Sequence, residues 1–182
     1  IQFKELAQKY SKAATDTDNK NPLFTLHYGH LLYNYNLIDD AILYYKKTIE
    51  YDHEIIEAHF NLASIYNDQK NFLESTKYYI TVCDLLTELE AKHRKKPKPE
   101  HKEKIDTFQN ARIFLANKYL IENKIEDAYS LIIKIPVSVE KYELLAIYYE
   151  KTNQREQALS IYKQLKDRLK ISKYDPKIKE LS

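Results

Sequence analysis

One pattern of small and aromatic residues returns along this chain at intervals of about 34 positions. Gly29 and Ala63 are 34 positions apart, and so are Tyr45 and Tyr79. Within each copy, apolar residues recur at the i, i+3, i+4 and i+7 spacing of an α-helix, and a polar break such as NDQKN separates two helical runs. Two short helices cannot bury an apolar face alone, so the copies must stack to build one continuous core. The pattern therefore predicts an all-α array of helical hairpins.

The small residues of the pattern mark where the two helices of a copy should approach closely. They are Gly29, Ala63, Ala116 and Ala146 on first helices, and Ala41, Ser75, Ala128 and Ala158 on second helices. A large side chain at these places would hold the helices apart and leave a void that destabilises the fold. The chain has only 1 glycine and 5 prolines among 182 residues, which also argues against a sheet with many tight hairpins.

These residues resemble the tetratricopeptide repeat family, whose unit is a helix–turn–helix of roughly 34 residues. The resemblance covers residues 1–168, as a half repeat at 1–18 and repeats at about 22–55, 56–89, 105–136 and 139–168, with a C-terminal capping segment at 169–182. It implies a right-handed superhelix whose first helices line a concave groove. The last two repeats are offset by only 30 positions, so we expect a short helix before Pro136. In the capping segment, Asp175 is the expected N-cap and Pro176 the first helical residue.

An insertion separates the second and third repeats, where the offset from Ala63 to Ala116 rises to 53 positions. The inserted residues, about 90–104, are basic, and two interpretations are open. The insertion could be a disordered loop, or both flanking helices could run on and return at Pro97–Pro99 as a longer hairpin around 85–108. We favour the hairpin, because Leu89 and Ile105 would then meet across it.

The middle of the insertion carries five cationic side chains in seven residues: Lys92, Arg94, Lys95, Lys96 and Lys98. Three interpretations are open for them, namely a solvated tip, a secondary contact with an acidic protein surface, or a contact with RNA or an anionic membrane. Aromatic residues for base stacking are not interleaved here. The whole chain has 29 Lys and Arg against 27 Asp and Glu, a balance that gives no sign of a nucleic-acid partner.

The sequence contains no pattern that supports catalysis, so we expect no enzyme activity, no cofactor and no metal. His27 and His30 could share a helix face, but two imidazoles need further ligands to hold a metal ion. Cys83 lies among apolar residues and should be buried, while His59 should be a core histidine. A single cysteine fits a reducing compartment, so we expect a cytoplasmic location. No apolar run is long enough to span a membrane.

The resemblance also implies where a partner would bind. Groove residues are those on first helices that point away from the small-residue contact: Leu26, His27, His30, Asn34, Phe60, Asn61, Ser64, Asn67, Ile113, Phe114, Asn117, Glu143 and Ile147. Asparagine amides both donate and accept hydrogen bonds, so a row of them could clamp a peptide backbone. Simple solvation of these polar residues is the alternative.

From these observations we expect a non-enzymatic protein-interaction scaffold or adaptor that holds a partner peptide or helix within a multiprotein assembly. An RNA-binding or RNA-processing helical-repeat module is the alternative. One branch of the family binds Hsp70/Hsp90 C-terminal tails through a basic carboxylate clamp, and here only Asn61 fits that clamp. The matching positions Leu26, His30, Asn110 and Phe114 supply no Lys or Arg, so we do not expect that partner. The chain has no Met and begins at Ile1, and we expect it to be part of a longer protein.

Overall fold

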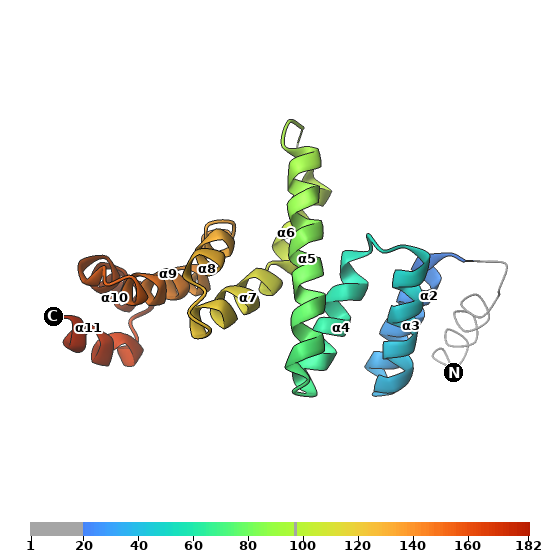
Figure 1. Cartoon of the computed structure of the whole chain (residues 1–182), viewed down its shortest axis with the longest axis horizontal. Coiled ribbons are helices and arrows are strands. Elements are labelled where there is room, and N and C mark those ends of the chain that lie inside the picture. Colours follow the sequence, from blue (N-terminus) through green and yellow to red (C-terminus); the bar gives the residue numbers. More distant parts are fainter. Residues whose placement is uncertain (1–19, 97) are drawn as a thin grey trace. The chain divides into compact units, whose positions relative to one another are not determined.

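The computed structural model describes residues 20–96 and 98–182, and the described residues form helices and turns without a strand (Figure 1). The α-helices are α2 (Pro22–Asn34), α3 (Ile38–Tyr51), α4 (Ile56–Asp68), α5 (Phe72–His93), α6 (Pro99–Phe108), α7 (Asn110–Ile121), α8 (Ile125–Ile132), α9 (Val139–Lys151), α10 (Arg155–Leu169) and α11 (Asp175–Leu181), with a 3₁₀ turn, η1, at Ser172–Tyr174. The predicted half repeat at 1–18 lies outside the described residues.

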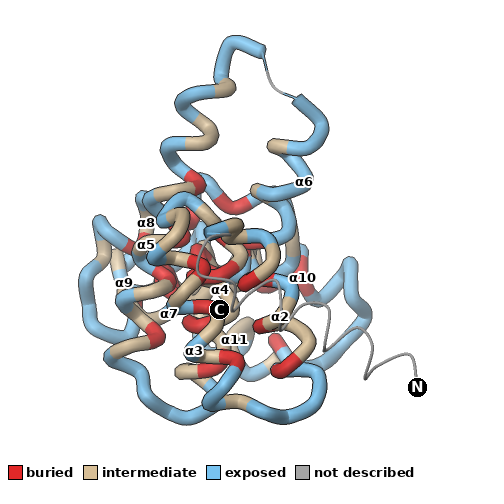
Figure 2. The backbone as a smooth tube through the Cα atoms, turned by 90° about the vertical axis from the view of Figure 1, so that its right-hand side faces the viewer, coloured by how far each residue is buried: buried red, intermediate tan, exposed pale blue. Residues whose placement is uncertain are grey.

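The chain divides into two compact units, Ile1–His101 and Lys102–Ser182. In unit 1, α2 packs on α3, α3 on α4, and α4 on α5; in unit 2, α7 packs on α8, α8 on α9, and α9 on α10. Within each unit these helices therefore pack against their neighbours in sequence, as a stack of hairpins requires. Along the helices, buried residues alternate with half-buried and exposed ones (Figure 2).

The small residues of the repeat lie at the places where these helices touch. Ala41, Ala63, Ser75, Ala116, Ala128, Ala146 and Ala158 are all fully buried. Gly29 packs directly against the ring of Tyr45, and a Cβ atom at position 29 would lie 2.8 Å from Cε1 of that ring. Close helix contact at the small residues was the prediction, and their complete burial confirms it.

The turn between the two helices of each hairpin uses one left-handed residue, yet none of these is glycine. Asn36, Lys70, Asn123 and Asn153 have φ values of 60°, 60°, 60° and 62°. In each turn the next residue donates its N–H to the carbonyl five residues earlier, for example Asn71 N to Tyr66 O at 2.8 Å. This is the Schellman geometry of a helix C-terminus, and asparagine adopts it at lower cost than other non-glycine residues. The turns thus form with almost no glycine in the chain.

The helix before Pro136 is short, as the offset of 30 predicts, because α8 has only 8 residues. Lys141 of α9 donates from Nζ to the carbonyl oxygens of Ile135 at 2.6 Å and Ile133 at 3.2 Å, so it satisfies carbonyls just beyond α8. Ser138 caps α9 by accepting the N–H of Lys141 at 3.2 Å. These bonds hold the short connection between the last two hairpins of unit 2 in place.

The insertion is helical on both sides of its turn, as the hairpin interpretation predicts. α5 extends over 22 residues to His93, and α6 begins at Pro99 and ends at Phe108, with Gln109 between it and α7. The third repeat was predicted to begin near 105, within α6, whereas the helix that pairs with α8 is α7. Leu89 and Ile105 belong to different units, so their contact stays a prediction.

The C-terminal segment folds against the last hairpin, with α11 and η1 both packed on α10. The prediction that Asp175 is the N-cap of this helix was wrong by one position. α11 begins at Asp175, its N-cap residue is Tyr174, and Pro176 lies within its first turn. The carboxylate of Asp175 instead contacts Lys166 Nζ at 2.5 Å, which ties α11 to α10.

Candidate interaction surface

Two stripes of side chains on the first helices of unit 1 form the candidate surface, here called the first-helix face. Its members are His27, His30 and Asn34 on α2, and Glu57, Phe60, Asn61, Ser64, Asn67 and Asp68 on α4. Each stripe follows steps of three or four residues, so each lies on one side of its helix. All of these side chains are exposed or half-buried.

Leu26 does not belong to this face, although it was predicted there. Its side chain is only 3% exposed and lies in the core of unit 1 with Leu62 and Tyr45. It therefore cannot contact a partner without disrupting the fold. The neighbouring His27 is exposed and takes the outward position.

A direct contact joins the two stripes. Nδ2 of Asn61 lies 2.9 Å from Nε2 of His30, so α2 and α4 are bridged side chain to side chain. An amide nitrogen can only donate, so His30 accepts through Nε2 and is neutral in this arrangement. Oε1 of Glu57 lies 3.3 Å from the same nitrogen and would accept from it if His30 were protonated.

The surroundings of His30 favour its neutral form. Burial lowers the pKa of His30 below its ordinary value of 6.5, the charge of Glu57 opposes this, and His27 lowers it further. The ring of His30 lies 5.5 Å from that of Tyr45 and 6.1 Å from that of His27, between centroids. The imidazole is thus a fixed acceptor on the face rather than a mobile cation.

Tyr79 of α5 packs against the α4 residues of the face. Its ring meets that of Phe60 edge to face at 5.9 Å between centroids, and its hydroxyl lies 3.3 Å from Ser64 Oγ. Burial raises the pKa of Tyr79, with the Ser64 contact opposing it. Phe60 and Ser64 are therefore held in place, while Asn34 is exposed and Asn67 half-buried at the far ends of the two stripes.

The predicted groove residues of unit 2 lie on α7 and α9, and they differ in their exposure and in their contacts. Asn117 is exposed, Phe114 is half-buried, and Ile113 and Ile147 pack against the unit's core. Oε1 of Glu143 accepts from Lys173 Nζ and from Tyr174 OH, both at 2.7 Å. Burial alone would raise the pKa of Glu143, but these two hydrogen bonds lower it overall. Glu143 is thus already occupied by the C-terminal segment, which sequence spacing gave no means to foresee.

The five predicted cations around the end of α5, here called the basic tip, are all exposed. Lys92 lies 3.6 Å from Glu54, and Lys98 lies 3.6 Å from Glu100. His93 lies within the tip and His101 shortly after it, and their rings stack with centroids 3.4 Å apart. Partial burial, then the charge of His101, lowers the pKa of His93. Exposed, loosely paired cations of this kind contribute little to stability.

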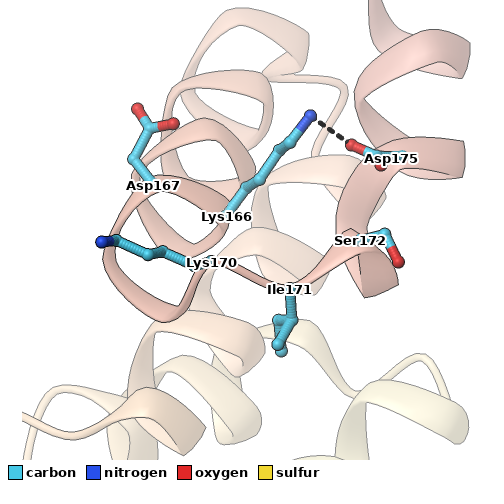
Figure 3. Close-up of a pocket in the computed structure, with 6 residues that line it drawn as sticks. All are labelled: Lys166, Asp167, Lys170, Ile171, Ser172 and Asp175. Carbon is cyan, nitrogen blue, oxygen red and sulfur yellow. Dashed lines mark ion pairs between the residues drawn. The ribbon is translucent and has the colours of Figure 1, made fainter.

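A shallow pocket of about 360 Å³, which no sequence pattern predicts, lies where α10 passes into η1 and α11 (Figure 3). Lys166, Asp167, Lys170, Ile171, Ser172 and Asp175 line it. The ion pair between Lys166 and Asp175 crosses it. Lys170, in the left-handed conformation with φ 53°, ends α10 and turns the chain around the pocket.

No group of three or more His, Cys, Asp or Glu residues that could hold a metal ion occurs within 20–96 and 98–182. Cys83 is buried, as predicted, and His59 is a core histidine at 6% exposure. None of the helices described combines the length and the apolar character that crossing a membrane requires.

Of the comparisons with known proteins, the one with solved structures gives a match. No family model matches the chain, and no curated protein matches it in sequence. Among solved structures, the chain is similar to YrrB, described as a TPR protein with an unusual peptide-binding site. The two share 16% sequence identity with a TM-score of 0.51, over 96% of this chain and 99% of that one. With its stacked helical hairpins, this chain therefore has a tetratricopeptide-repeat-like fold.

Proposed function

We propose that this protein is a non-enzymatic scaffold that binds a peptide or helix of a partner protein through the first helices of its repeats. The observation that carries the proposal is the first-helix face of unit 1, where the Asn61–His30 contact and Tyr79 hold polar and aromatic side chains in fixed positions. Side chains that are already fixed lose less conformational freedom on binding, so they favour affinity. YrrB, a TPR protein described as having a peptide-binding site, is similar to this chain in fold. That similarity supports the proposal.

The chemistry of the face suits a peptide backbone. Asn34 and Asn67 supply amide donors and acceptors at its far ends, and Ser64 supplies a hydroxyl between them. Phe60 offers an apolar contact for a partner side chain, and the ring of Tyr79 packs against Phe60 and holds it in place. In unit 2, Asn117, Phe114, Ile113 and Ile147 would act in the same way, while Glu143 would require the C-terminal segment to move.

The basic tip would add a second contact, to an acidic surface of a partner within the same assembly. Its exposed cations would act mainly on the association rate, because charges at the rim of an interface steer the encounter of two proteins more than they raise the affinity.

The RNA-binding alternative is not favoured, since the tip has no aromatic residue for base stacking other than histidine. A cytoplasmic location is part of the proposal and can be checked by cell fractionation.

Site-specific photo-crosslinking tests the proposal. A photoreactive phenylalanine analogue is placed at His27 or Asn67 on the first-helix face, and, as controls, at Glu50 or Lys77 on the second helices α3 and α5. We expect both face positions to capture the same partner and both control positions to miss it. Equal capture from all four positions, or capture only from α3 and α5, would exclude the first-helix face as the binding surface.

A further inference from the structure

We infer that the first-helix face of unit 1 takes a partner segment that carries Lys or Arg side chains, in preference to an acidic one. This inference rests on the proposed function and names the chemistry of the partner. The basis is the sign and position of the charges on the two helices that form the face.

The charges on these two helices are all negative. The 13 residues of α2 include no Asp, Glu, Lys or Arg, and the 13 residues of α4 include only Glu57 and Asp68. The whole chain carries a formal net charge of +2, so this face has the opposite sign to the protein as a whole. A local field of one sign on a surface selects segments of the other sign.

Both carboxylates are available to a partner. The side chain of Glu57 is 46% exposed, and Asp68 is exposed at the C-terminal end of α4. Within residues 20–96 and 98–182, neither forms an ion pair with Lys or Arg. The nearest basic group to Glu57 is His30, which accepts a hydrogen bond from Asn61 and so leaves the carboxylate charge uncompensated.

The spacing of the two carboxylates also predicts the spacing of the partner's cations. Glu57 and Asp68 are separated by three helical turns on one stripe of α4, which corresponds to roughly 16 Å along the helix axis. An extended peptide covers that length in about five residues. Phe60, Asn61 and Ser64 lie between the carboxylates and would contact the intervening residues. The fitting segment is therefore extended, with an apolar or neutral stretch between two basic residues.

Panning a random-peptide display library against the purified chain tests this inference. We expect the selected peptides to be enriched in Lys and Arg and depleted in Asp and Glu. Their affinity should fall about tenfold in the variant Glu57→Gln/Asp68→Asn at low salt, because two charge-assisted contacts are lost. The matched control, Asp40→Asn/Glu50→Gln on α3, makes the same change in net charge and should bind like the wild type.

The outcomes separate this inference from the proposed function. Peptides with no basic enrichment, whose binding is nevertheless lost in Phe60→Glu, would overturn the charge preference and leave the peptide-binding function in place. If no peptide is selected, or if selected peptides bind Phe60→Glu as well as the wild type, both are overturned. Circular dichroism of each variant separates lost binding from lost fold.

Discussion

The ring of Tyr45 occupies the space that a side chain at Gly29 would need, with Cε1 2.8 Å and Cδ1 2.9 Å from the position of a Cβ atom there. Tyr45 is 1% exposed, and its ring also packs against His30 of the first-helix face. The only glycine of the chain therefore permits close packing between α2 and α3, and Tyr45, which fills that space, also supports His30 of the first-helix face.

Replacing that glycine should destabilise unit 1 even though alanine is the better helix former. Gly29→Ala gains about 1 kcal/mol of helix propensity, but overpacking a tight contact costs about 1–3 kcal/mol. We expect a net loss of about 1 kcal/mol in the free energy of unfolding, measured by urea denaturation. In a double-mutant cycle with Tyr45→Leu, which makes room for the new methyl group, the Gly29→Ala loss should shrink or reverse. An unchanged loss in that background would contradict the contact.

Among the turns between paired helices within 20–96 and 98–182, Lys70 alone adopts the left-handed conformation without being an asparagine, which tolerates it better. Its φ of 60° is costly for an ordinary residue, by about 1–2 kcal/mol relative to glycine. Glycine in turn loses more chain entropy on folding, by roughly 0.5–1 kcal/mol. We expect Lys70→Gly to raise the free energy of unfolding by about 0.5–1 kcal/mol.

Asn36→Gly is the matched control for that experiment, because Asn36 holds the equivalent turn with the same φ of 60°. Asparagine already visits this conformation readily, so the gain should be smaller than at Lys70. Equal gains at the two positions would mean that conformational strain at Lys70 is not the cause.

Much of the fold follows from local pattern, and the exceptions have physical causes. The helical period and the small residues predict the paired helices, and the asparagines at equivalent places in their hairpins, Asn36, Asn123 and Asn153, could have located those turns. Leu26 was misplaced because it adjoins the outward stripe of its helix, and only packing decides on which side of that boundary a residue lies. Contacts such as Glu143 with Tyr174 join residues 31 positions apart, and no periodicity encodes them.

Acidification should weaken the fold through His59. Its Nε2 donates to the carbonyl oxygen of His53 at 3.0 Å, while its buried Nδ1 has no hydrogen-bond partner among the described residues. Burial lowers the pKa of His59, opposed by the His53 hydrogen bond and assisted by the charge of the His53 ring. The unfolded chain therefore binds more protons than the folded one at mildly acidic pH, so the free energy of unfolding falls with pH from about 6.5 downward.

Urea denaturation at neutral and mildly acidic pH checks this dependence. His59→Gln keeps a donor for the His53 carbonyl and cannot take up a proton, so its stability should fall less over the same interval. His30, whose pKa is also lowered, should account for part of the remaining slope. A pH slope in His59→Gln equal to that of the wild type would show that protonation of His59 does not destabilise the fold.

Glu150 joins the C-terminal segment to the last repeat through two side-chain hydrogen bonds. Its carboxylate accepts from Tyr162 OH at 2.5 Å and from Lys177 Nζ at 2.6 Å, so one side chain of α9 holds both α10 and α11. Glu150→Gln keeps the acceptor for Tyr162 but removes the charge that attracts Lys177. Because Lys177 is 42% exposed and screened by solvent, we expect a loss of only about 0.5–1 kcal/mol in the free energy of unfolding.

Amide hydrogen exchange measures the effect on each helix: in Glu150→Gln, exchange in α11 should become faster while exchange in α9 stays slow. Its control, Glu156→Gln on the exposed start of α10, should leave both rates unchanged, and equal acceleration in α9 and α11 would mean that Glu150 supports the whole unit rather than the segment.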